Sequence, residues 1–420
     1  MIRREYNIAV RLWRSTKQDL WLRPILWIAG VLALAAAAYP AGALLDLPLP
    51  DVRPETAQSL LELLASAMLT VTTVAFSMVL VVITFASGQV SPRSIPGILR
   101  DAAIQDALGV FVAGLVFGLV GMLSIEAIRP LPNGPMVTVL MGAIICTLTV
   151  LYLVRLIHHV SRRVQVTHIL AQQRHLADDA IQHFFALPLP GRQCSRSEAD
   201  DGGPAAERQS VQLQASVSGY LQVLNLDDVY RLAVERDLQI RVRHTEGDYV
   251  GRDWPVFDVS GGAELDAETR DILLAAAQIG ESRTPDGDPL FPLEVLGEIG
   301  ERALSPGVND TGTALAALDH LADCLFRWAG HGERESCLVD KDGRLRVTIA
   351  PPCLATALER TVSRILRSGD GNPEVERRVL WLLETLAARP EVDAAARREI
   401  GALRQRALQG GTRRPRPDPT

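Results

Sequence analysis

The segment that decides the fold is 63-LLASAMLTVTTVAFSMVLVVITFA-86, a mostly apolar run that contains no charged residue. About 20 apolar residues in a helix cross the ~30 Å hydrocarbon core of a bilayer, so this segment predicts a transmembrane helix. Hydroxyl side chains recur within it at intervals of three, four and seven residues, which places them along one helical face. These residues are Thr70, Thr73, Ser77 and Thr84. We therefore expect an integral membrane protein whose second span has a polar face.

Four apolar segments predict a multi-pass α-helical domain over residues 25–157. The segments are about 25–45, 63–86, 107–128 and 136–157. Residues 1–24 carry six basic residues against two acids, and basic residues also follow the second and fourth segments. This distribution predicts cytoplasmic termini. A cleaved signal peptide is the competing interpretation of the first segment, but its apolar region would be about 7–15 residues and three more spans follow.

The third segment contains three glycines that line one helical face, Gly114, Gly118 and Gly121. Small residues at this spacing allow another helix to approach closely, so we expect a packing seam here.

The polar face of the second segment supports two interpretations. In the first, several subunits surround an axis, Thr70, Thr73, Ser77 and Thr84 line a path, and acids at the outer ends of the spans concentrate cations. The outer acids are Glu62 and Glu126, and the cytoplasmic end of the path is marked by Ser91 and Arg93. In the second, the acids are interfacial and the hydroxyls bond to carbonyls one turn back. Because hydroxyl side chains are common where helices pack together, the sequence favours the second interpretation.

The composition restricts the class of protein. Of 420 residues, 48% are hydrophobic and 22% are charged, which suits a chain divided between membrane and water. A formal net charge of -6 argues against a nucleic-acid partner. The five cysteines form no Cys-x-x-Cys pair, and no phosphate-binding loop, nucleophile elbow or His-Glu-x-x-His motif occurs. We therefore expect no metal, no cofactor and no enzymatic activity.

The second half of the chain predicts a soluble α+β cytoplasmic domain. We expect a helical stalk at 158–186, a linker at 187–210, a small β module at 211–262, a mainly helical domain at 263–409 and a disordered tail at 410–420. Asp266 and Asp310 are candidate N-caps of helices near 266–279 and 310–329. Other helices are expected near 289–303, 354–368, 373–388 and 391–408, and two short strands between 339 and 349.

A dense polar run is the main candidate site of the soluble half. It comprises Glu298, Arg302, Ser305, Asn309 and Asp310. It could bind a small ligand or a neighbouring subunit, or it could be a helix corner with a good cap. The nearby Asp286-Gly287-Asp288 could suggest Ca²⁺, but the later ligands of an EF-hand loop are missing, which favours a turn.

Several motifs together resemble a bacterial family of predicted membrane proteins, domain of unknown function 2254. They are Phe76-Ser77, Ser91-Pro92-Arg93, Asp101-x-x-x-Gln105-x-x-Leu108-Gly109-x-Phe111, Ser218-Gly219-Tyr220, Gly247-Asp248-Tyr249-Val250, Arg283-Thr284 and the run from Arg302 to Asp310. The resemblance covers roughly residues 10–330 and implies a multi-pass protein of the bacterial inner (plasma) membrane. This chain departs from the family pattern at Gly287 and Thr311. The resemblance implies no activity.

The function that these patterns predict is a homo-oligomeric ion channel or permeation protein, with a lipid bilayer around it and an inorganic ion or small ligand as its cargo. The alternative is a membrane-anchored sensor or interaction module without transport activity.

Overall fold

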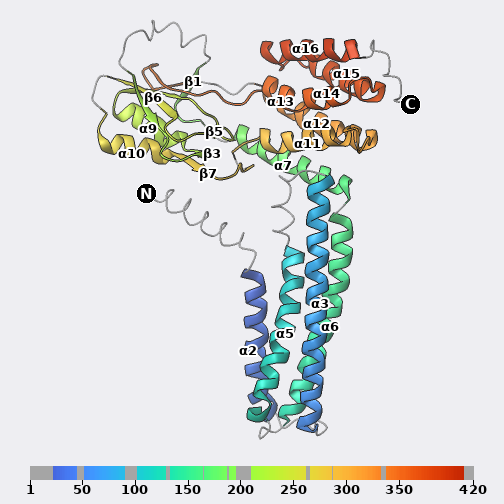
Figure 1. The fold of residues 1–420 in the computed structure, drawn as a ribbon. Helices are drawn as coiled ribbons and strands as arrows, with labels where there is room; N and C mark the ends of the chain where they lie inside the picture. Colours follow the sequence, from blue (N-terminus) through green and yellow to red (C-terminus); the bar gives the residue numbers. More distant parts are fainter. Residues whose placement is uncertain are drawn as a thin grey trace. The chain divides into compact units, whose positions relative to one another are not determined.

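Figure 1 shows the fold in a computed structural model of the chain. The described residues are 22–44, 52–89, 102–128, 133–163, 165–186, 189–194, 210–261, 265–285, 287–332 and 337–410. Within them, side chains are described except at 38–44, 85–89, 125–128, 160–163, 192–194 and 410. The chain divides into two compact units, which we call the helical unit (Met1–His168) and the α/β unit (Ile169–Thr420).

Long apolar helices form the described part of the helical unit. They are α2 (Leu22–Leu44), α3 (Pro54–Gln89), α5 (Ala102–Ile128) and α6 (Gly134–Arg163) (Figure 1). Among the described residues, three helices are long and apolar enough to cross a membrane, over Pro54–Thr84, Ala102–Ser124 and Gly134–His159. The described apolar part of α2, Leu22–Ala37, is shorter. All four predicted apolar segments therefore lie on helices, and three of these qualify as candidate spans.

The glycine face of α5 packs against α3 and α6. A Cβ atom added at Gly118 would lie 3.0 Å from the Cβ of Ala65 and 3.2 Å from its backbone nitrogen. One added at Gly114 would lie 3.0 Å from the sulfur of Met68 on α3, and also 3.0 Å from Ile145 on α6. The predicted packing seam is confirmed, because these glycines let the neighbouring helices approach to a distance that a larger residue would prevent.

A polar contact attaches α2 to α5. Arg23 Nη1 lies 2.8 Å from Asp106 Oδ2, and the indole nitrogen of Trp27 lies 3.4 Å from Asp106 Oδ1. The Trp27 ring also packs edge-on against Tyr152 of α6 at a centroid distance of 5.7 Å. A Cβ at Gly109 would lie 2.7 Å from the Trp27 ring, so the indole occupies space that only a glycine leaves.

The segment expected to form one continuous stalk contains two helices. Helix α6 ends at Arg163, and α7 (Val166–Ala186) begins three residues later. One face of α7 is buried in the α/β unit, at Leu170, Ala177 and Ile181. From Ile169 onward this helix is therefore part of the core of the α/β unit.

Two sheets form the β part of the α/β unit (Figure 1). The six-stranded sheet has the order β1-β8-β9-β4-β6-β2, and the three-stranded sheet has the order β5-β3-β7. The strands are β1 (Arg192–Cys194), β2 (Ser210–Gln214), β3 (Gly219–Leu224), β4 (Leu238–Val242), β5 (Tyr249–Val250), β6 (Pro255–Gly261), β7 (Ala277–Gly280), β8 (Cys337–Val339) and β9 (Leu345–Thr348). Helices α9 (Leu226–Glu235) and α10 (Ala267–Ala276) accompany them.

The sheets contain more strands than the predicted β module of residues 211–262. Strands β1, β7, β8 and β9 lie outside that range, and β9 pairs in parallel with β4, with Ile240 opposite Val347. Both of these side chains are buried in the core. The helix predicted over 266–279 ends at Ala276, and the residues from Ala277 onward form β7, which pairs with β3. These pairings depend on contacts far apart in the sequence, which local patterns do not reveal.

Helices complete the α/β unit. They are α11 (Leu290–Ala303), α12 (Thr311–His331), α13 (Leu354–Arg360), α14 (Val362–Ser368), α15 (Pro373–Ala387) and α16 (Ala394–Gly410). Asp266 and Asp310 are N-caps as predicted, accepting hydrogen bonds from the backbone nitrogens of Thr269 and Thr313. The predicted helix 354–368 is divided at Thr361, which is buried where Gly297 of α11 approaches its backbone.

We predict that Gly118→Ala destabilises the helical unit by ~1–3 kcal/mol, because the new methyl group would overlap Ala65 at a contact between two helices. The matched control is Gly142→Ala in α6, where the added Cβ meets only Leu64 at an ordinary 3.5 Å. Thermal unfolding of the purified chain in detergent measures both. Equal midpoints for the two variants would contradict a tight seam at Gly118.

Candidate functional site

A row of polar side chains runs along one face of α3, and we call it the polar stripe. Its members follow one another at intervals of three, four and seven residues, and all of them are exposed on the single chain. They are Glu55, Ser59, Glu62, Ser66, Thr70, Thr73, Ser77 and Thr84. Five of these residues were predicted from the sequence. Glu55, Ser59 and Ser66 were not predicted, although the same helical spacing extends to them.

The opposite face of α3 forms the contact with the rest of the helical unit. The buried residues of this face include Ala57, Leu61, Leu64, Met68, Ala75, Val79 and Val82. On a helix these positions lie about half a turn away from the polar stripe. The described helices α2, α5 and α6 therefore leave the polar stripe uncovered.

The threonines of the polar stripe donate their hydroxyl protons to their own helix. Thr70, Thr73 and Thr84 donate to the carbonyl oxygens four residues earlier, at 3.1, 2.9 and 2.9 Å. Ser59 does the same toward the carbonyl of Glu55 at 3.0 Å. The backbone hydrogen bonds that the second interpretation predicted are thus present. Each of these oxygens keeps lone pairs that accept a hydrogen bond or contact a cation.

Three other predicted residues cannot be placed in a site. Ser91 and Arg93 lie outside the described residues. Glu126 lies in α5, two residues before its end, and its side chain is not among those that the structure describes.

The predicted corner between α11 and α12 is a capped turn. Asp310 accepts hydrogen bonds from the backbone nitrogen and the hydroxyl of Thr313, which lower the pKa of its carboxyl group. Its own backbone nitrogen donates to Ala303, and the Ser305 hydroxyl donates to the carbonyl of Arg302. Asn309 has a left-handed backbone conformation with a φ of 48°. These contacts shape the corner itself.

Glu298 lies on the side of the corner that packs against α14. Its carboxylate accepts a hydrogen bond from Arg364 at 3.4 Å, and Glu301 lies 3.5 Å from the same guanidinium nitrogen. These ion pairs hold α11 and α14 together, and they suit the helix-corner interpretation.

An ion cluster lies around the N-terminal part of α11, and its members are Arg283, Asp288, Glu294 and Arg360. Arg283 bridges the two acids, with Nε 2.7 Å from Asp288 Oδ2 and Nη1 2.6 Å from Glu294 Oε2. Arg360 Nη1 adds a second cation 3.2 Å from Glu294 Oε1. The side chains of Arg283, Asp288 and Glu294 are no more than 10% exposed.

Asp288 joins the ion cluster to the first turn of α11 and to a tight turn before β5. Its Oδ1 accepts hydrogen bonds from the backbone nitrogens of Leu290 and Phe291 at 3.1 Å. Gly247, with a φ of +93°, approaches so closely that a Cβ there would lie 2.0 Å from Asp288 Oδ2. Burial raises the pKa of Asp288 to about 6, and the neighbouring Arg283 opposes that increase.

The four residues of the ion cluster could not be grouped from the sequence, where Asp288 stands in a segment that favours a turn. They are spread over α11, α13 and the loop before α11, so no local spacing connects them. Among the described residues, no group of three or more His, Cys, Asp or Glu side chains could hold a metal ion.

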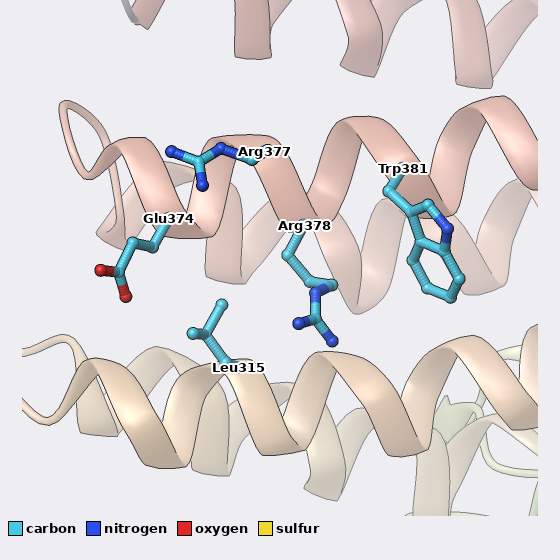
Figure 2. Close-up of a pocket in the computed structure, with 5 residues that line it drawn as sticks. All are labelled: Leu315, Glu374, Arg377, Arg378 and Trp381. Atoms are coloured by element: carbon cyan, nitrogen blue, oxygen red, sulfur yellow. The ribbon is translucent and has the colours of Figure 1, made fainter.

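An open groove of about 520 Å³ lies between α12 and α15 (Figure 2). It is lined by Leu315, Glu374, Arg377, Arg378 and Trp381. Arg378 forms an ion pair with Asp319, and its guanidinium lies 5.9 Å from the centre of the Trp381 ring. One of the two guanidinium groups in the groove is thus engaged within the protein.

Apolar helices of membrane-spanning length joined to a mixed α/β unit define a membrane protein. The chain belongs to the family described as predicted membrane protein (DUF2254), which matches residues 17–385. Similar proteins include uncharacterized proteins of Mycobacterium bovis and of Mycobacterium tuberculosis strain H37Rv. Each is 27% identical over 381 residues, covering 88% of this chain and 71% of the relative. No solved structure matches the chain.

We predict that the contribution of Asp288 to the stability of the α/β unit increases as the pH falls from about 8 to about 5. The pKa of Asp288 is about 6 in the folded chain and 3.8 for an ordinary aspartate. Between these values the folded state binds a proton that the unfolded state does not, so this contribution is complete below 3.8 and is lost as the pH rises through 6. The difference corresponds to roughly 3 kcal/mol.

The measurement is the thermal midpoint of the wild type minus that of Asp288→Asn as a function of pH, because asparagine cannot titrate. Asp319→Asn, which removes an exposed acid of α12, is the control. A difference curve for Asp288→Asn without a step near pH 6 would contradict the prediction.

Proposed function

We propose that the protein is a homo-oligomeric membrane permeation protein in which the polar stripe lines a path for cations. The supporting observation is the exposure of the polar stripe on the single chain. Lipid tails supply no hydrogen-bond partners, so a polar face at membrane depth has to meet protein or water. Copies of the chain around an axis would bring the polar stripe of each α3 to the centre of the assembly.

The chemistry of the polar stripe favours cations over anions. Thr70, Thr73 and Thr84 direct their hydroxyl protons inward to backbone carbonyls, so their outward-facing groups are lone pairs. Glu55 and Glu62 add carboxylates, which also accept hydrogen bonds and carry negative charge. Oxygen lone pairs and carboxylates replace the hydration shell of a hard cation, whereas they repel an anion.

The proposed orientation has four spans, with α2 as the first, in the inner membrane of a bacterium and with both termini in the cytoplasm. Basic residues before α2, between α3 and α5 and at the C-terminal end of α6 support it. Glu62 and Glu126 then lie toward the outer side, and Ser91 and Arg93 toward the cytoplasm. The α/β unit would assemble or regulate the path from the cytoplasmic side, with an inorganic ion as the transported species.

A second candidate is a membrane-anchored sensor or interaction module. The same backbone hydrogen bonds favour it, because threonines satisfied by their own helix can lie in a dry contact between subunits. In that case the helical unit holds the α/β unit at the bilayer, and the corner from Glu298 to Asp310 is available for a partner or ligand.

We predict that cysteines placed in the polar stripe react with a membrane-impermeant thiol reagent. In a background without the five native cysteines, Thr73→Cys and Ser77→Cys should be labelled because water fills the path. Leu151→Cys and Val154→Cys are the controls, since these residues are 61% and 62% exposed on α6 and do not belong to the face of α3 that carries the polar stripe. If the polar-stripe cysteines stay unlabelled under every condition, conduction is ruled out and the anchored module remains.

We predict that Glu62→Gln lowers cation flux through the reconstituted chain about 10-fold at low ionic strength, because the carboxylate concentrates cations at one end of the path. The effect should shrink at about 1 M salt, where charges are screened within ~3 Å. The control is Glu374→Gln, an exposed acid of the α/β unit. The flux of K⁺ and of Cl⁻ from liposomes measures the outcome, and equal effects of the two substitutions would argue against the assigned role of Glu62.

A further inference from the structure

Aromatic side chains of β3, β5 and the loops next to β4 and β6 lie close together, and we call them the aromatic patch. Its members are Tyr220, His244, Tyr249 and Trp254, and Val217 precedes β3 in the sequence. Tyr249 is 52% exposed, Trp254 is 49% exposed and Val217 is 46% exposed. The Tyr249 ring lies 5.4 Å from Tyr220 and 6.4 Å from Trp254, and His244 stacks 6.5 Å from Trp254. A contiguous exposed patch of this kind marks an interaction surface.

The aromatic patch is held in place by the backbone. Ala215 donates a hydrogen bond to the carbonyl of Trp254, and Asp253 donates one to the carbonyl of Ala215, both at 2.9 Å. The backbone nitrogen of Arg252 donates to the Ser218 hydroxyl at 2.8 Å. A Cβ at Gly251 would lie 2.8 Å from the indole, so the ring rests directly on the backbone of this glycine. Binding through such a surface requires little ordering of side chains.

We propose that the aromatic patch binds the headgroup region of the lipid bilayer. Tryptophan and tyrosine combine an apolar ring with a polar edge, and they are enriched where hydrocarbon meets water. The neighbouring residues Arg252 and Asp253 are both exposed and carry opposite charges. This pair suits a zwitterionic headgroup surface, so binding does not require anionic lipid.

The chain tethers the unit that bears the aromatic patch to a helix with a candidate span. Helix α6 ends at Arg163 and α7 begins at Val166, so only two residues separate the helix with the candidate span from the helix that enters the α/β unit. The three backbone steps from Arg163 to Val166 cover at most ~11 Å. A tether this short raises the effective concentration of lipid around the α/β unit, whatever the orientation of that unit. Lipid binding by the aromatic patch does not require the helical unit to conduct ions.

The test uses the fluorescence of the full chain reconstituted into phosphatidylcholine vesicles with or without bromine atoms on the lipid chains near the headgroups. Trp254→Phe is compared with Trp381→Phe, because both tryptophans are 49% exposed on the same unit. Subtracting the emission of each variant from that of the wild type gives the emission of the substituted tryptophan. The contributions of the other tryptophans, including Trp27 in α2, cancel in this difference. Unchanged thermal midpoints establish that both variants are folded.

We expect brominated lipid to abolish most of the emission assigned to Trp254 and to leave that of Trp381 unchanged. Adding an anionic lipid should not alter this result. If brominated lipid quenches the emission of Trp254 no more than that of Trp381, the proposal is overturned. The proposal is also overturned if the Trp254 emission is quenched neither by brominated lipid nor by aqueous iodide, because a protein surface rather than lipid would then cover the aromatic patch.

Discussion

Polar groups at membrane depth must find a partner, and this constraint governs the arrangement of α3. Its threonines meet the constraint within the helix, since each hydroxyl proton bonds to a carbonyl one turn back. The carboxylates of Glu55 and Glu62 have no proton to donate in this way when they are ionised. A helix that needed only to cross lipid would gain stability from leucine or valine at these positions. Within the polar stripe it is thus the carboxylates, and not these threonines, that require water or a partner outside the helix.

The direction of the polar stripe is fixed by the contact on the other side of α3. Gly118 of α5 receives Ala65, and the Thr149 hydroxyl of α6 lies 3.3 Å from the sulfur of Met68. Rotating α3 enough to cover Thr70 or Ser77 within the single chain would bring large side chains against Gly118, where there is no space for them. The polar stripe is thus exposed because the packing seam leaves α3 no alternative orientation.

Features with a local period could be predicted from the sequence. The apolar segments, the glycine seam at Gly118 and the N-caps Asp266 and Asp310 each depend on residues within a few turns of one another. Features made by distant residues could not be predicted. Strand β9 reaches β4 from about 100 residues away, at Ile240 and Val347.

The same distinction between local and distant residues applies to the candidate sites. Five members of the polar stripe were predicted from its helical spacing, and the three that were missed lie mainly before the apolar segment, where composition no longer resembles a span. The ion cluster was missed because Glu294 meets Arg283 of the preceding loop and Arg360 of α13 only after α11 has packed against both segments. The spacing of charges in the sequence does not indicate which of them will be buried.

The contacts of α7 determine to which unit this helix belongs. Arg174 of α7 forms a 2.6 Å contact with Asp323 of α12, and Phe185 stacks on His331 at 4.6 Å. Leu170, Ala177 and Ile181 of α7 are buried. The periodicity of this segment predicted a stalk that continues the fourth span, because a helical apolar stripe indicates that a face is buried but not which partner covers it. The partner is the α/β unit, so α7 belongs to that unit from Ile169 onward.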